Sequence, residues 1–265
     1  MSRTPRRPLA RGFTLIELMV VMVIIAILAS LISVAVVKVI ASAKITKVKT
    51  ELDGMHGAII MFKTTRQLQS LPPNFQDATA LKRFWDQVFP WAQEQPPTNL
   101  TAAQALVFWL SSFSSDRNKP ISGQGTRSAA YPFVVARLHD PANPTDTISA
   151  GTTSQWVNSA GKLVYPVYWP DHTDMSQPYV YLDVSRNYQT PPTYQNAYSG
   201  NTLAPYKNDA GNAYVNAQSF QIICAGVDND HGKGGNGGNF PSGIAGGDMD
   251  NITNFAKGLL VDEKP

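Results

Sequence analysis

The longest apolar run of the chain lies near its N-terminus. Residues 18–37 are twenty consecutive positions without a charged side chain. At about 1.5 Å per helical residue, this run spans about 30 Å, the thickness of the hydrocarbon core of a bilayer. A cleaved secretory signal peptide usually has a shorter apolar region that ends in a small-residue cleavage site. The pattern therefore predicts a retained membrane helix over residues 13–37.

Beyond this run, hydrophobic residues continue at helical spacing. Six of them recur every three or four residues and share one helix face, namely Ile45, Val48, Leu52, Met55, Ile59 and Phe62. Charged residues occupy the other faces, among them Lys47, Lys49, Glu51, Asp53 and Lys63. Such a stripe is typical of a helix packed on a core. The sequence predicts one helix from residue 13 to about 68, with residues 38–71 as its amphipathic part, ending before Pro72-Pro73.

The rest of the chain predicts a mixed body. Residues 77–93 and 99–115 have helical patterns, and Thr101 with Gln104 forms a possible capping box. After Gly123, four runs have strand-like composition, at residues 131–138, 162–169, 178–184 and 219–226. We therefore expect an α+β fold, in which the long N-terminal helix packs on a C-terminal antiparallel sheet over residues 178–265. Residues 72–177 would be an inserted helical and strand region.

The aromatic residues of this insertion allow two interpretations. They are Trp85, Trp91, Trp109, Tyr131, Trp156 and Trp169. They could form a binding surface, for instance for carbohydrate. Two amphipathic helices need something to pack against, however, which favours a second small core.

Charge and cysteine content argue against several classes of function for this chain. The chain has 22 basic and 19 acidic residues, and four arginines lie in the first twelve residues without any acid. The remainder has no basic excess, so no nucleic-acid partner is indicated. The single cysteine, Cys224, excludes an intramolecular disulfide and lies in an apolar run typical of a buried side chain. The four histidines are scattered, and no catalytic Ser/His/Asp or Cys/His set is evident.

A specific motif precedes the apolar run, Arg11-Gly12-Phe13-Thr14-Leu15-Ile16-Glu17. It resembles the processing site of the type IV pilin and pseudopilin superfamily. The resemblance implies that residues 1–12 are a leader and that a prepilin peptidase cuts between Gly12 and Phe13 and methylates Phe13. Glu17 takes the place of the family's glutamate at the fifth mature position. The family's frequent proline at the twenty-second mature position is Val34 here, so no helix break is imposed.

Glu17 is the one ionisable residue at the edge of the apolar run. A carboxylate in hydrocarbon costs at least about 2.5 kcal/mol and usually has a partner. Cleavage after Gly12 would create a free amine on Phe13, which could pair with Glu17 of a neighbouring subunit. We expect Glu17 to set the register of the next subunit during filament assembly. The alternative is a glutamate near the headgroups that contacts water.

The C-terminal region contains a glycine-rich acidic loop. Nine of the 22 residues from 226 to 247 are glycine, and the loop is bracketed by Asp228, Asp230, Asp248 and Asp250. Clustered carboxylates repel one another unless a cation lies between them, and Ca²⁺ binds about six to eight oxygen ligands. We expect a calcium site, with Asp228 and Asp250 as the strongest ligands; the alternative is a glycine-rich surface loop that binds nothing specific.

Two other metal sites fit this loop less well. It is not an EF-hand, because Asn239 stands where a bidentate glutamate is required. His231 has no second soft ligand for zinc.

The loop also resembles the C-terminal calcium loop of the major pseudopilin of type II secretion systems. The matching elements are Ala225-Gly226-Val227-Asp228, Asp250-Asn251-Ile252-Thr253-Asn254-Phe255 and Pro178-Tyr179-Val180-Tyr181. The loop is longer than usual, and Asn251 stands where a second aspartate is common. Among the superfamily's members, the resemblance favours a major-pseudopilin-like protein.

The sequence therefore predicts a structural subunit of a pilus or pseudopilus, and no enzyme. The resemblance implies a single-pass protein of the bacterial inner membrane with its C-terminal body in the periplasm. Its partners would be other copies of itself, prepilin peptidase, an inner-membrane assembly platform and minor pseudopilins. A surface type IV pilin is one alternative, although such pilins often carry a C-terminal disulfide. A membrane-tethered periplasmic carbohydrate-binding module is the other.

Overall fold

The computed structural model describes residues 13–151, 155–171, 174–186, 188 and 190–265. The chain divides into two units, Met1–Lys44 and Ile45–Pro265. The helices are α1 (Leu15–Thr65), α2 (Ala78–Val88) and α3 (Ala102–Leu110), with 3₁₀ turns at Val135–Arg137, Gly246–Asp248 and Leu260–Glu263. The strands are β1 (Phe113–Ser114), β2 (Arg127–Ser128), β3 (Leu138–His139), β4 (Ser149–Ala150), β5 (Trp156–Val157), β6 (Val167–Tyr168), β7 (Val180–Asp183), β8 (Tyr194–Gln195), β9 (Thr202–Leu203), β10 (Phe220–Cys224) and β11 (Ile252–Thr253).

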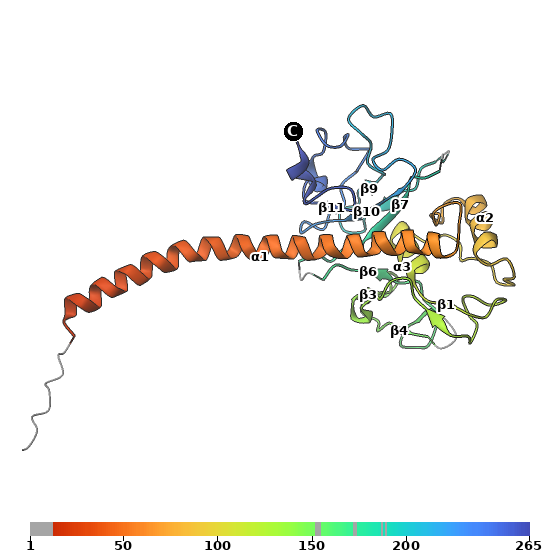
Figure 1. The fold of residues 1–265 in the computed structure, drawn as a ribbon, viewed down its shortest axis with the longest axis horizontal. Coiled ribbons are helices and arrows are strands. Elements are labelled where there is room, and N and C mark those ends of the chain that lie inside the picture. The colour runs from red at the N-terminus through yellow and green to blue at the C-terminus, as the bar shows by residue number, and fades with distance from the viewer. Residues whose placement is uncertain (1–12, 152–154, 172–173, 187, 189) are drawn as a thin grey trace, which may run out of the picture. The chain divides into compact units, whose positions relative to one another are not determined.

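The predicted long helix is confirmed as the single element α1 (Figure 1). It ends a few residues before the expected Pro72-Pro73, because Gln67 adopts a left-handed backbone conformation with φ of 52°. The amide of Leu68 donates to the carbonyl of Lys63, and that of Gln67 donates to Thr64. These are the two bonds of a Schellman motif, which terminates a helix and satisfies its last carbonyls.

The sequence predicted a membrane span over residues 13–37. In the part of the chain that the structure describes, no helix combines the length and the apolar character needed to cross a bilayer.

The core of the second unit forms on the predicted face of α1. Val48, Leu52, Met55, Ile59 and Phe62 are all buried, and Ile45 packs against them. The opposing surface is the antiparallel sheet with strand order β11-β10-β7. Its side chains alternate between two hydrophobic clusters, so both of its faces are covered. Burial on both faces explains why these strands have nearly continuous apolar sequences.

The insertion packs into this core and does not build a core of its own. Trp85, Trp109 and Trp156 are buried in the same hydrophobic cluster as Leu52. The expectation of a second small core is therefore wrong, although these three aromatic residues are packed inside the protein and do not form a surface. Trp91 is the exception, with 66% of its surface exposed.

The two insertion helices, α2 and α3, confirm the predicted helical segments and are shorter than the patterns suggested. The capping box at the start of α3 is confirmed as well. The Gln104 amide donates to Thr101 Oγ1, and the Thr101 amide donates to Gln104 Oε1.

Two of the four predicted strands form only over a few residues. In the run 131–138, residues Val135–Arg137 form a 3₁₀ turn, and only Leu138 joins β3. In the run 162–169, only Val167 and Tyr168 form a strand, which pairs with β3. Pro132 and Pro166 interrupt these runs and remove backbone donors that a sheet requires. The local composition of both runs is strand-like, but the prolines prevent the hydrogen-bond ladders between neighbouring strands from extending.

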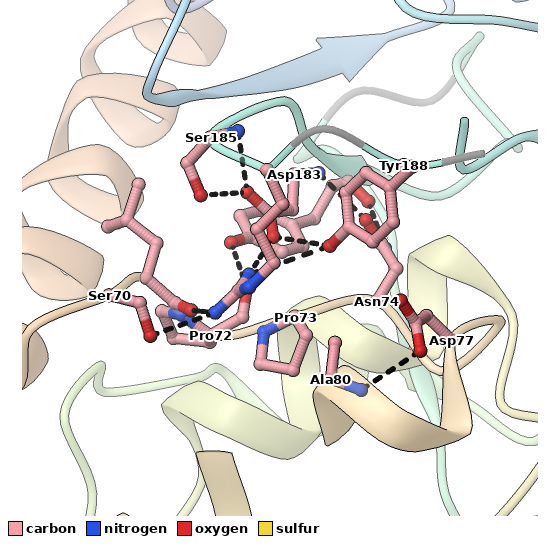
Figure 2. Close-up of polar contacts among 12 residues, drawn as sticks. Ser70, Pro72, Pro73, Asn74, Asp77, Ala80, Asp183, Ser185 and Tyr188 are labelled. Carbon is pink, nitrogen blue, oxygen red and sulfur yellow. Dashed lines mark hydrogen bonds and ion pairs between the residues drawn. The ribbon is translucent and has the colours of Figure 1, made fainter. Parts of the chain in front are cut away.

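The free edge of β7 is covered by the chain that follows α1. Asn74 is buried, its side-chain amide donates to Tyr181 O at 2.8 Å, and it accepts from the Asp183 amide at 2.7 Å. Figure 2 shows this polar cluster, in which the buried Asp183 carboxylate also accepts from Arg186 and Tyr188. The Arg186 guanidinium in turn donates to Leu71 O. These contacts satisfy backbone groups that an uncovered edge strand would leave open.

Candidate functional site

The first candidate site is the start of α1. Gly12 lies outside the described residues, whereas Phe13 is described and is 82% exposed. Thr14 stands at the helix start, where its amide and its hydroxyl both donate to Glu17 Oε2, at 2.9 and 2.8 Å. The Glu17 amide donates back to Thr14 Oγ1 at 3.3 Å. This reciprocal arrangement is a capping box.

The capping box bears on how Glu17 could pair with a neighbour. One carboxylate oxygen, Oε2, receives both bonds from Thr14. A carboxylate offers about four lone-pair positions, so Oε1 can accept from a further donor without dismantling the cap. This capping role was not among the predictions from the sequence, although the Thr-x-x-Glu spacing signals it.

Apolar side chains cover the first turns of α1. Those described at positions 15–28 are largely exposed, including Leu15 at 76%, Ile16 at 70% and Met22 at 63%. A continuous exposed apolar surface marks a site of contact with lipid or with other protein chains.

The second candidate site joins Asp228 and Asp250. Asp250 Oδ2 accepts from the amides of Val227 at 2.7 Å and Asp228 at 3.1 Å. The other oxygen of Asp250, Oδ1, is buried and has no hydrogen-bond partner among the described residues. Burial, together with the adjacent Asp250 charge, raises the pKa of Asp228 to about 6. Asp228 Oδ1 accepts from the Asp230 amide at 2.8 Å, so the buried acceptor without a partner in this pair is Asp250 Oδ1.

Glycine makes this approach possible. Gly226 has a φ of +67°, and a Cβ built on it would lie 2.4 Å from the carboxylate carbon of Asp250. Any larger residue would displace Asp250, so Gly226 is required for the pair.

Asp230 and Asp248 have different surroundings. Asp230 accepts from the Ser199 hydroxyl at 2.6 Å, from the Asn201 side-chain amide at 2.7 Å and from the Gly232 amide at 2.9 Å. Asp248 is buried and accepts from the Tyr206 hydroxyl and from the amide of Gly234 at 2.9 Å. Burial raises the pKa of the Asp248 carboxyl group. Each carboxylate therefore joins a backbone amide of the loop to side chains of the segment that precedes β10, and the two fix the loop against that segment.

His231 is a buried residue of the same loop, and each of its ring nitrogens contacts another segment of the chain. Its Nε2 lies 2.9 Å from Pro178 O, and its Nδ1 lies 2.9 Å from the side-chain amide nitrogen of Asn196. A carbonyl can only accept and an amide NH₂ can only donate, so the ring is neutral and carries its proton on Nε2. Burial lowers the pKa of His231 to about 4. Both ring nitrogens have structural partners.

The acidic loop depends on residues outside it that were not among the predicted site residues. Ser199, Asn201 and Tyr206 supply the donors that hold the aspartates, and Asn196 orients His231. They come from the segment between β7 and β10, which has no periodic pattern. The one signal in the sequence for these contacts is the abundance of Asn, Ser and Tyr in that segment.

A calcium ion fits the Asp228–Asp250 pair in its donor chemistry. In the chain as described, no group of three or more His, Cys, Asp or Glu side chains is placed to hold a metal ion. A cation here would therefore use two carboxylates and complete its shell with carbonyl and water oxygens. The buried Oδ1 of Asp250, which has no hydrogen-bond partner among the described residues, would be one of its ligands.

Comparison with known proteins identifies the N-terminal segment. Residues 7–33 match the family model described as the prokaryotic N-terminal methylation motif. No curated protein and no solved structure matches the chain. The match includes Gly12, Phe13 and Glu17, and it supports a type IV pilin-like subunit that is processed by a prepilin peptidase.

Proposed function

We propose that this protein is a structural subunit of a pseudopilus, of the major-pseudopilin type found in type II secretion systems. The observation that carries the filament-subunit part of the proposal is the methylation motif at residues 7–33, placed at the start of a 51-residue helix with an exposed apolar surface. The choice of the pseudopilin type rests on the resemblance of the acidic C-terminal loop. The N-terminal part of α1 anchors the subunit in the bacterial inner membrane, and residues 45–265 form a periplasmic body. The exposed apolar side chains then become the contacts between subunits in the filament.

The proposed partners follow from this role. Prepilin peptidase removes residues 1–12, and other copies of the chain polymerise through α1 on an inner-membrane assembly platform with minor pseudopilins. After cleavage, the amine of Phe13 is a cation beside the Glu17 of a neighbouring subunit. The free Oε1 of Glu17 accepts from this amine, while Oε2 keeps the cap with Thr14.

We expect a Gly12→Val variant to keep its leader. A side chain at the cleavage position obstructs the peptidase, so intact mass spectrometry after co-expression with a prepilin peptidase should show the uncut chain. The wild-type chain should begin at a methylated Phe13. Gly57→Ala is the matched control, because no atom lies within 4 Å of the added Cβ, and it should be processed normally.

A Glu17→Ala variant separates processing from assembly. We expect it to be cleaved and methylated like the wild type but to be missing from sheared or cross-linked filaments. An uncut wild-type chain would refute the processing step, and filaments formed by Glu17→Ala would refute the role of Glu17.

We propose that Asp228 and Asp250 bind calcium, which stiffens the loop. In the full-length chain in detergent micelles, calcium at about 100 times its Kd should stabilise the fold by about 2.7 kcal/mol relative to EDTA. The variants Asp228→Asn and Asp250→Asn should lose the calcium response and remain folded in EDTA. Calorimetric titration and melting curves measure both quantities.

Two sets of variants sharpen the calcium test. Asp230→Asn and Asp248→Asn remove internal acceptors, so they should lower the melting temperature in EDTA as well as in calcium. Asp86→Asn alters an exposed α2 residue outside the loop and should change neither quantity. If wild-type protein shows no saturable binding at millimolar calcium, the metal site is wrong and the filament proposal stands on the methylation motif alone.

A further inference from the structure

An arginine with unused donors lies at the C-terminal end of α1. The Cζ atom of Arg66 is 4.7 Å from the ring centroid of Phe62, 5.1 Å from that of Phe89 and 5.9 Å from that of Phe113. Throughout the described ranges, its guanidinium has no hydrogen bond or ion pair to an acceptor. Burial lowers the pKa of Arg66. A cation held on aromatic faces keeps its N–H groups free for an anionic ligand.

A cavity of about 200 Å³ adjoins this guanidinium. Met61 and Thr65 of α1 line one side of it, and Phe113, Ser128 and Ala129 line another. Met61 is 66% exposed, which is unusual for a large apolar side chain. The cavity thus combines an apolar wall with a positive charge at its rim.

The end of strand β2 also lies beside the cavity. Strands β1 and β2 form a sheet of two strands, so one edge of β2 has no strand partner in the described part of the chain. Ser128 and Ala129, at and just after the end of β2, are exposed. An extended polypeptide can add its own backbone hydrogen bonds to such an edge.

We propose that this cavity binds the C-terminal end of a polypeptide chain. The terminal carboxylate pairs with the Arg66 guanidinium, whose planar fork matches a carboxylate in a bidentate geometry. The last side chain, which is apolar, enters the cavity against Met61 and Phe113. A C-terminal residue carries its carboxylate and its side chain on the same Cα. The two can therefore reach Arg66 and the adjoining cavity at once. This proposal rests on the second unit alone and is independent of filament assembly.

The test uses the full-length chain in detergent micelles and fluorescence polarisation. The probe is a labelled hexapeptide that ends in leucine with a free carboxylate, and its matched control is the same peptide with a C-terminal amide. We expect the amide to bind at least about tenfold more weakly, because a charge-assisted bond is lost. Arg66→Gln should weaken the free-acid peptide by a similar factor.

Arg83→Gln is the control variant. Arg83 is an exposed arginine of α2 that does not line this cavity, so its loss should leave the affinity unchanged. Melting curves of both variants check that each is folded.

Four outcomes would overturn the proposal. Equal binding of the acid and the amide excludes carboxylate recognition, and unchanged binding by folded Arg66→Gln excludes Arg66. No binding of either peptide excludes the site itself. Competition by N-acetylleucine as strong as that of unlabelled hexapeptide would assign the cavity to small organic acids, which also contradicts a polypeptide ligand.

Discussion

Replacing Glu51 with alanine is expected to lower the free energy of unfolding by about 3–5 kcal/mol, because it leaves a charged partner uncompensated in a largely buried site. Glu51 Oε1 and Oε2 accept from Arg137 Nη1 and Nη2, both at 2.6 Å. The hydroxyls of Tyr168 and Tyr179 donate to the same carboxylate. Only 15% of each charged side chain is exposed. Without the carboxylate, the Tyr168 and Tyr179 hydroxyls lose their acceptor, and Arg137 keeps only its bonds to Trp169 O and loses its counter-charge.

The measurement is chemical denaturation of the full-length chain in detergent micelles. Asp53→Ala is the matched control, since Asp53 lies two residues away on α1 and its side chain is 56% exposed where it pairs with Lys49. A pair with a solvent-exposed carboxylate contributes about 0–1 kcal/mol, and Lys49 keeps its bond to Thr253 O, so this variant should be nearly neutral. If Glu51→Ala and Asp53→Ala lower the free energy of unfolding equally, the Glu51 network does not make the proposed contribution to stability.

A double variant tests whether the loss comes from the pair. In Glu51→Ala/Arg137→Met the unpaired guanidinium is gone, so the loss should be clearly smaller than the sum of the two single losses. Additive losses would mean that Glu51 and Arg137 act independently, against the geometry of the bidentate bond.

The periodic and local parts of the fold could be predicted from sequence. The spacing of Val48, Leu52 and Met55 identified the buried face of α1, because a helix places every third and fourth residue together. The capping box of Thr101 and Gln104 was predicted because its partners are three residues apart. Signals of this kind need no knowledge of the rest of the chain.

Long-range contacts could not be predicted in the same way. Glu51 was assigned to the polar faces of α1, and its burial depends on Arg137, which is 86 residues away in the sequence. Arg137 itself lies in a run that was expected to be a strand and that forms a 3₁₀ turn. Nothing in the spacing of either residue indicates their partnership.

The acidic loop illustrates the same limit within the candidate site. The sequence grouped Asp228, Asp230, Asp248 and Asp250 by their proximity along a glycine-rich stretch. Among the described residues, Asp250 keeps a buried oxygen without a partner beside Asp228, whereas Asp230 and Asp248 accept from the side chains of Ser199 and Tyr206. The donors that make this difference come from the segment before β10, where the sequence has no recognisable pattern.

Acidification below pH 6.5 is expected to destabilise the fold through His231. Its pKa is about 4 in the folded chain against 6.5 for an ordinary histidine, so the unfolded state binds the proton more readily. The stabilisation from the neutral ring is complete above pH 6.5 and is lost as the pH falls toward 4. At 1.36 kcal/mol per pKa unit, the loss reaches about 3 kcal/mol.

The physical cause is the pair of hydrogen bonds on the buried ring. Protonation places a hydrogen on Nδ1, which faces the side-chain amide of Asn196, itself a donor. The neighbouring carboxylate of Asp230 favours the charged ring, but burial outweighs this attraction. The Asp228 carboxyl group acts in the opposite direction, because a raised pKa stabilises the fold at low pH. The wild-type profile therefore contains two opposing contributions.

The difference between two profiles isolates His231. Unfolding free energies of the wild type and of His231→Gln, measured in EDTA from pH 7.5 to 4.5, should converge as the pH falls, because only the wild type has this histidine to protonate. His139→Gln, which changes a histidine outside the loop, should run parallel to the wild type. If His231→Gln does not fold, ¹⁵N NMR of the wild-type ring provides the test. It should report the neutral tautomer with the proton on Nε2 at pH 5.5, and a charged ring at that pH would refute the prediction.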